Sequence, residues 1–194
     1  MRRVSWSMGV SLDGYIIGPD GSFDFGAPDE EVFRFCIEEI RGMGVHFMGR
    51  RLYETMLYWE TADQDPSLSE DEREWTALWK ALPKVVFSRT LTTVVGNARL
   101  ASGDVAEEIG RWRAEPGDGG IAVGGADLAH QVAALGLIDD YLVRFHPVLV
   151  GGGVPFFDHQ EQRVELELVG TRAFASGVVF LHHRVKRQLS PAGD

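Results

Sequence analysis

Two short apolar segments of the sequence are followed directly by residues suited to binding phosphate. The dipeptide Arg50-Arg51 follows residues 45–48, and the dipeptide Gly124-Gly125 follows residues 119–123. Arginine binds phosphate oxygens through paired hydrogen bonds, and glycines at the start of a helix leave backbone N–H groups open to an anion. The alternatives are a solvated basic turn for the arginines and an ordinary tight turn for the glycines.

Three further groups follow other apolar segments. Ser88-Arg89 offers a hydroxyl and a cation to an adenosine phosphate, or forms a simple turn. Residues 151–153 are three glycines beside Phe156, so a flat ligand could approach the bare backbone there; a glycine-rich bend is the alternative. Asp13 follows the first apolar segment and is the candidate catalytic carboxylate, although Asp-Gly is also a very common turn dipeptide.

Alternating strands and helices must position these groups. Residues 4–10 alternate between apolar and polar side chains, which predicts a strand. Helices are expected from a first turn at residues 28–31 and after Gly49, Ser69, Asp104 and Gly125. Further strands are expected at residues 45–48, 84–88, 94–100, 119–123 and 141–150, and as a hairpin within residues 164–185. The order predicts an α/β fold in which helices cover both faces of a mostly parallel sheet with an antiparallel C-terminal hairpin. We expect one domain over residues 1–187 and a loose tail at 188–194.

Composition narrows the class of partner. The 194 residues include 29 acidic residues against 19 Lys and Arg, a net charge of −10, which disfavours nucleic acid and anionic membrane surfaces. Cys36 is the single cysteine, so no intrachain disulfide can form, and the histidines lack metal-ligand spacing, so we expect no metal. With no signal-peptide pattern and no run of eighteen apolar residues, a cytoplasmic location is expected.

Five segments occur in order along most of residues 3–185. They are SLDGYI at 11–16, MGRRLYETM at 48–56, KVVFSR at 84–89, VGGADL at 123–128 and PVLVGGGVPFF at 147–157. Together they resemble the dihydrofolate-reductase-like superfamily, in the branch of the riboflavin-biosynthesis reductase domain. The resemblance implies a three-layer αβα fold and an NADPH-dependent reductase whose cofactor lies across the carboxyl ends of the strands.

The resemblance also implies roles for individual residues. The cofactor would be bordered at the nicotinamide by Gly9, Val10, Ile16 and Ile17, at the adenosine phosphate by Gly49, Arg50, Arg51, Ser88 and Arg89, and at the pyrophosphate by Val123, Gly124, Gly125, Ala126, Asp127 and Leu128. The substrate would meet Asp13, Gly152, Gly153 and Phe156. The Gly124–Gly125 peptide is expected to be cis, a state that costs about 3 kcal/mol in a non-proline residue.

The sequence departs from the dihydrofolate reductase pattern at the residue that would assist proton delivery. Phe33 stands where dihydrofolate reductases carry a carboxylate, and Asp13, Asp24 and Asp29 are the nearest replacements, with Asp13 the best placed. We therefore expect hydride transfer from NADPH to a small heterocycle, similar to 5-amino-6-(5-phosphoribosylamino)uracil reductase. The alternatives are a dihydrofolate reductase with a displaced proton donor and a non-catalytic NADPH-binding protein. A homodimer is expected from the habit of the family and from the five tryptophans.

Overall fold

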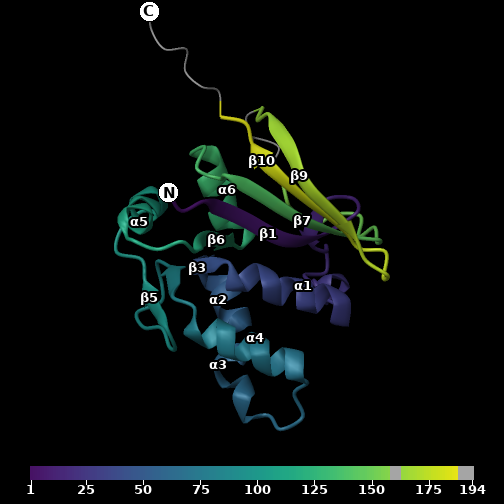
Figure 1. Cartoon of the computed structure of the whole chain (residues 1–194), viewed down its shortest axis with the longest axis horizontal. Helices are drawn as coiled ribbons and strands as arrows, with labels where there is room; N and C mark the ends of the chain where they lie inside the picture. The colour runs from purple at the N-terminus through teal and green to yellow at the C-terminus, as the bar shows by residue number, and fades with distance from the viewer. Residues whose placement is uncertain (158–162, 188–194) are drawn as a thin grey trace, which may run out of the picture.

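The computed structural model describes residues 1–157 and 163–187 and is built around one eight-stranded sheet (Figure 1). Its order is β5–β4–β3–β6–β1–β7–β10–β9. The strands are β1 (Val4–Ser11), β3 (Met43–Gly49), β4 (Lys84–Phe87), β5 (Ala98–Leu100), β6 (Gly120–Gly124), β7 (Asp140–His146), β9 (Leu166–Ala173) and β10 (Val179–Val185). Neighbouring strands from β5 across the sheet to β7 pair in parallel. Strand β10 runs antiparallel to both β7 and β9. The predicted α/β class and antiparallel C-terminal hairpin are confirmed.

The helices begin where the local sequence signals predict. They are α1 (Glu30–Arg41), α2 (Arg50–Met56), α3 (Tyr58–Thr61), α4 (Glu70–Ala81), α5 (Val105–Ala114) and α6 (Ala126–Ala134), with 3-10 turns η1 (Asp24–Gly26) and η2 (Ala62–Gln64). Ser69 and Asp104 each form a capping box at the start of a helix, and Asp29 accepts a hydrogen bond from the backbone N–H of Val32. These bonds satisfy first-turn N–H groups that would otherwise lack a partner.

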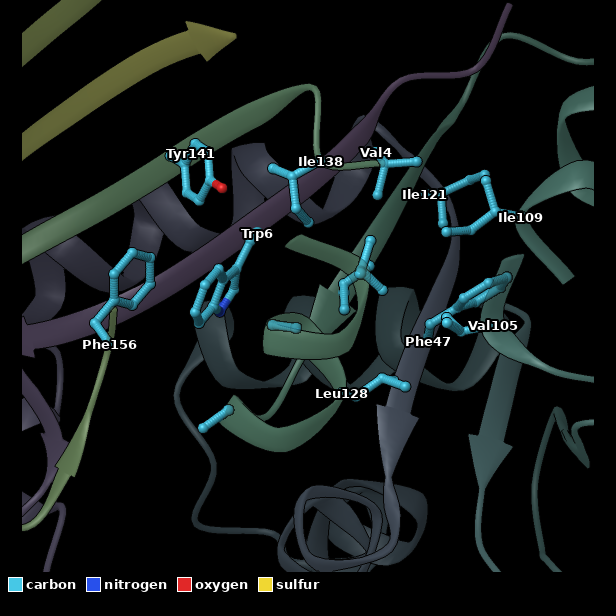
Figure 2. Close-up of a cluster of buried hydrophobic side chains, with 14 of the residues drawn as sticks. Val4, Trp6, Phe47, Val105, Ile109, Ile121, Leu128, Ile138, Tyr141 and Phe156 are labelled. Atoms are coloured by element: carbon cyan, nitrogen blue, oxygen red, sulfur yellow. The ribbon is translucent and has the colours of Figure 1, made fainter. Parts of the chain in front are cut away.

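Side chains of successive residues in a strand enter opposite faces of the sheet. Phe47 on β3 packs in a core with α5 and α6, whereas its neighbour Met48 packs with α1, α2 and α4. Figure 2 shows part of the first core, a buried cluster that includes Trp6 of β1, Phe47 of β3 and Leu128 of α6. Helices therefore cover both faces of the sheet, which gives the three layers expected.

Two strand boundaries differ clearly from the predictions, and the first is the start of β5, which begins at Ala98 and not at residue 94. Strand β7 ends at His146 and not at residue 150, because Pro147 has no N–H to donate and the N–H of Val148 turns back to the carbonyl of His146. The chain then returns as β8 (Val154–Pro155), which pairs with β2 (Tyr15–Ile17).

The predicted cis bond between Gly124 and Gly125 is wrong: this peptide is trans. The turn from β6 into α6 is made instead by a positive φ of 86° at Gly125, a conformation that glycine adopts without steric cost. Among the described residues, no helix is long and apolar enough to cross a membrane. The predicted tail at 188–194 lies outside the described residues.

Candidate functional site

The carboxyl ends of five parallel strands form one row at a single edge of the sheet. Along the sheet, the row runs from Phe87 (β4) through Gly49 (β3), Gly124 (β6) and Ser11 (β1) to His146 (β7). Pairing between β1 and β6 stops at Trp6 and Val123, but β1 continues along β7 as far as Ser11. The end of β1 therefore has one edge without a partner strand, beside the end of β6. In open α/β sheets, ligands bind at this edge.

Two helices that start from this row differ from α1, α4 and α5 at their N-termini. The helices α2 and α6 begin after Gly49 and Gly125, and neither glycine has a side chain that could cap the first turn. By contrast, α1, α4 and α5 are each capped by a carboxylate or hydroxyl side chain. At the strand ends, first-turn N–H groups of α6 are therefore open to an external acceptor.

Arginine side chains lie beside these helix starts. Gly49 pairs in register with Phe87, which brings the residues that follow each of them, Arg50 and Ser88, to neighbouring positions. Arg50, Arg51 and Arg89 are all exposed, and the Nη1 atom of Arg50 lies 3.4 Å from Oε1 of Glu54. The structure thus brings the predicted cationic residues to one end of the row.

The Ser88 hydroxyl has a local role in addition to the one predicted. Its Oγ accepts hydrogen bonds from the backbone N–H groups of Thr90 at 3.1 Å and Leu91 at 3.0 Å. These bonds shape the turn after β4. The O–H of Ser88 remains able to donate a hydrogen bond to a ligand.

Several predicted cofactor residues have buried side chains. They are Val10, Ile16, Val123, Ala126 and Leu128. Gly124 is also enclosed, because a Cβ there would overlap the side chain of Leu52 and lie 2.7 Å from Nε2 of His46. The side chains of these residues offer little surface to a cofactor, so backbone atoms are the main contacts available there, whereas Asp127 is exposed in the first turn of α6.

The side chain of Phe156, which was predicted to contact the substrate, is buried in the core. Its ring has no exposed surface and stacks on Trp6 with ring centroids 4.0 Å apart (Figure 2). Its backbone N–H donates to the carbonyl of Gly14. A large ring without polar atoms is stabilised in the core, so Phe156 anchors the loop and leaves no surface for a substrate.

Asp13 joins the loop after β1 to the loop after β7. Its carboxylate accepts hydrogen bonds from the backbone N–H groups of Val150 at 3.1 Å and Gly151 at 2.7 Å. The hydroxyl of Ser11 and these N–H groups lower the pKa of Asp13. They favour the ionised acceptor and so oppose proton donation by this residue. Its assignment as a substrate-contacting catalytic residue stays a prediction.

The glycines of the β7–β8 loop pack on the same region. A Cβ at Gly153 would overlap the backbone of Ile17, and Gly152 and Gly153 have φ angles of 153° and 113°. Gly153 therefore allows close packing of the two loops, whereas Gly151 and Gly152 have room for a side chain and are favoured by their positive φ angles. The contact of Gly152 and Gly153 with substrate stays a prediction.

Phe33 does not point toward the sheet. Its ring packs on Trp75 and Trp59, with centroids 5.6 and 6.3 Å away. The carboxylate that α1 does direct at the sheet is Glu39, which accepts from Ser7 Oγ at 3.1 Å and forms an ion pair with Arg144. Burial raises the pKa of Glu39. Sequence analysis missed Glu39, although its spacing from Val32 and Cys36 places it on the apolar stripe of this helix.

A second missed residue is His146, at the end of β7. Its side chain is 5% exposed, and a Cβ built on Gly9 would lie 3.0 Å from its Nε2 atom. The ring of Phe25 meets the imidazole edge to face at 6.2 Å. The available signal was a histidine directly before Pro147, within the strand predicted at residues 141–150.

A family model of the RibD C-terminal domain matches residues 2–180. The chain belongs to the RibD C-terminal domain family. Within this family, the uncharacterized protein YyaP of Bacillus subtilis is 32% identical over 179 residues, which cover 92% of each chain. A second B. subtilis protein, the uncharacterized YwjB, is 25% identical over 189 residues and covers 91% of this chain and 95% of its own.

Solved structures of RibD-type proteins share the fold. A putative riboflavin biosynthesis protein from Shewanella sp. PV-4 has a TM-score of 0.75 and 22% identity, covering 96% of this chain and 100% of that one. A deaminase/5-amino-6-(5-phosphoribosylamino)uracil reductase from Thermotoga maritima has a TM-score of 0.62 and 14% identity, covering 95% of this chain and 57% of that one. The resemblance inferred from the five sequence segments is confirmed.

Proposed function

We propose that this RibD C-terminal-domain protein is an NADPH-dependent reductase that transfers a hydride to a C=N or C=O group of a small heterocycle. The observation that carries the proposal is the row of strand ends. At one end of it, exposed arginines lie near helices that begin with uncapped glycines; at the other, β1 and β7 end beside a buried histidine. Membership of the RibD C-terminal domain family supports the same chemistry.

The residues along the row fit the parts of NADPH in order. Arg50, Arg51 and Arg89 would hold the 2′-phosphate, and the open N–H groups at the start of α6 would hold the pyrophosphate. The edge of β1 near Gly9, which lacks a partner strand on the β6 side, would receive the carboxamide of the nicotinamide. When bound, NADPH supplies the hydride; the chain orients the acceptor and excludes water.

The charges around the proposed substrate end favour a substrate without phosphate. Residues 4–33 and 145–157 contain no Lys or Arg, while Asp13, Asp20, Asp24 and Asp29 lie in the first of these ranges. Arg144, which adjoins the second range, is paired with Glu39. The T. maritima protein is named for a phosphoribosylamino substrate, but a phosphate here would face carboxylates without a free cation from either loop.

Of the alternatives, a dihydrofolate reductase is the less favoured enzyme, because the residue at the acid position, Phe33, packs on tryptophans of α3 and α4. A non-catalytic NADPH-binding protein would keep the phosphate end of the row and lose turnover. Tryptophan quenching by NADPH tests binding in every case.

The deciding experiment is stopped-flow oxidation of bound NADPH against a panel of heterocycles. The panel contains dihydrofolate, a ribosylamino-pyrimidine and the same compound with a 5′-phosphate. We expect turnover with the non-phosphorylated ribosylamino-pyrimidine and little turnover with dihydrofolate or with the 5′-phosphate. Quenching without oxidation of NADPH by any member supports the non-catalytic alternative, and absence of quenching contradicts the proposed cofactor.

A further inference from the structure

His146 is a buried titratable side chain to which hydride transfer by itself assigns no role. It lies at the carboxyl end of β7, next to the end of β1, where the nicotinamide is placed. Its Nε2 atom is directed at Gly9, and a Cβ there would lie 3.0 Å from it, closer than an ordinary van der Waals contact. The imidazole therefore occupies the position between β1 and the turn that contains Phe25 and Gly26.

The charged groups around the imidazole come from two elements. Arg144 lies two residues earlier on β7, donates to Ser7 Oγ at 2.9 Å and is paired with Glu39 of α1. Asp29, the N-cap of α1, contributes the opposite charge. Burial and the charge of Arg144 lower the pKa of His146, and Asp29 opposes this shift in part. The ring is therefore mainly neutral at neutral pH and gains a proton only at a pH below the usual titration range of histidine.

Other candidate acids near this end are less suited to giving up a proton. Asp13 and Asp29 both accept backbone N–H hydrogen bonds, which lower their pKa values together with side-chain hydrogen bonds from Ser11 and Ser176 respectively. Glu39 is held by Ser7 and Arg144. His146 has no such fixed acceptor role and lies at the strand end itself.

We propose that His146 is the proton donor of the reductase, a proposal that rests on the proposed function. As the hydride forms a C–H bond at the acceptor carbon, the π bond of the C=N or C=O group breaks. The electron pair left on nitrogen or oxygen takes a proton from a ring nitrogen of His146, and the imidazole regains a proton from water. The heterocycle thereby gains two electrons from the dihydronicotinamide, with net uptake of one hydride and one proton.

The first test is single-turnover hydride transfer between pH 5 and pH 8 with the active heterocycle of the panel. Wild type should react faster as the pH falls, because the protonated fraction of His146 rises. His146→Gln keeps a hydrogen-bond donor but has no proton to give, so its rate at pH 6 should fall by roughly 10²- to 10⁴-fold and lose this pH dependence. His146→Asn should behave alike, and His183→Gln, on the opposite face of β10 from His182, is the matched control.

A second readout does not depend on turnover. NMR titration of the imidazole, assigned through the signals missing in His146→Gln, should give a pKa below 6.5 and a shift of the ring signals when the heterocycle is added. Far-UV circular dichroism and NADPH quenching like those of wild type show that the variants fold and bind cofactor.

Two failures are distinguishable. If wild type neither quenches with NADPH nor oxidises it, the proposed function fails. If wild type turns over and His146→Gln keeps its rate within about threefold with the same pH profile, only the role of His146 is overturned.

Discussion

His46 on β3 and Gly124 on β6 lie against each other on one face of the sheet. A Cβ at Gly124 would lie 2.7 Å from Nε2 of His46 and would also overlap Leu52. The glycine is therefore required by packing, a role that the sequence did not indicate beside phosphate binding and a tight turn. The two roles can be separated by comparing the two glycines that flank the phosphate end of the row.

Gly124→Ala should destabilise the protein by about 1–3 kcal/mol, because the added methyl group must displace His46 and Leu52. Gly49→Ala is the matched control: its φ of −76° suits alanine, and a Cβ there meets nothing within 4 Å. We expect its free energy of unfolding in urea to stay within about 0.5 kcal/mol of wild type. Equal stability of the two variants would refute the packing role of Gly124.

His46 should make the fold sensitive to acid. Burial, helped by the charge of Lys84, lowers the pKa of His46 to about 4 from its usual 6.5. Below pH 6.5 the unfolded chain binds a proton that the folded protein excludes, so stability should fall by about 2 kcal/mol between pH 7.5 and pH 5 from this residue alone. Urea unfolding at both pH values should show a smaller loss in His46→Gln than in wild type or His183→Gln. An unchanged loss in His46→Gln would contradict the assignment.

NADPH should bind more tightly than NADH. The exposed Arg50, Arg51 and Arg89 can pair with the 2′-phosphate, and a contact with a charged partner contributes about 1.5–3 kcal/mol. The double variant Arg50→Ala/Arg51→Ala should lose about 10- to 100-fold in NADPH affinity, by tryptophan quenching, and little in NADH affinity. Arg73→Ala on α4 is the control. Equal dissociation constants for NADPH and NADH in wild type would exclude this use of the arginines.

Asp13→Asn should loosen the junction of the two loops. An asparagine offers one oxygen where the carboxylate now accepts from both Val150 and Gly151, and its NH₂ group would face an N–H donor. We expect turnover to fall about fivefold with unchanged NADPH affinity, since the phosphate-binding end of the row is remote along the sheet. Asp118→Asn, at an exposed position, should keep wild-type turnover. If Asp13→Asn keeps the turnover of wild type, this loop junction has no role in the reaction.

The expected homodimer has a testable surface. Leu168 on β9 and Val179 on β10 are 56% and 39% exposed and lie on the same face of the hairpin by register. If a second copy covers them, Leu168→Glu should dissociate the dimer, whereas Leu135→Glu at the end of α6, which is 55% exposed, should not. Light scattering decides this: a mass near 21.5 kDa for wild type at micromolar concentration would discard the dimer.

Local signals in the sequence predicted local structure well. The caps at Ser69 and Asp104 were confirmed because a capping box involves residues only three positions apart. The positive φ angles of 85° at Gly177, in the hairpin turn, and of 66° at Gly136, after α6, are likewise local features, because glycine adopts them without steric cost. The alternation of strands and helices then predicted the parallel sheet.

The parts of the site that were missed depend on contacts between distant segments. The ion pair of Glu39 with Arg144 joins residues 105 positions apart, and the position of His146 depends on Gly9 across two strands. The burial of Phe156 depends on its stacking against Trp6. No pattern within one segment states which side chain of another will face it, so these features needed the tertiary structure.

The central place of β1 in the sheet has a consequence for synthesis on the ribosome. Its two neighbours, β6 and β7, are made more than a hundred residues later. At a translation rate of about 5–20 residues per second, the apolar side chains of Val4, Trp6 and Val10 are made on the order of 10 s before the strands that bury them. The nascent chain therefore carries an unpaired, aggregation-prone strand for most of its elongation. We expect the sheet to form only once residue 146 has left the exit tunnel.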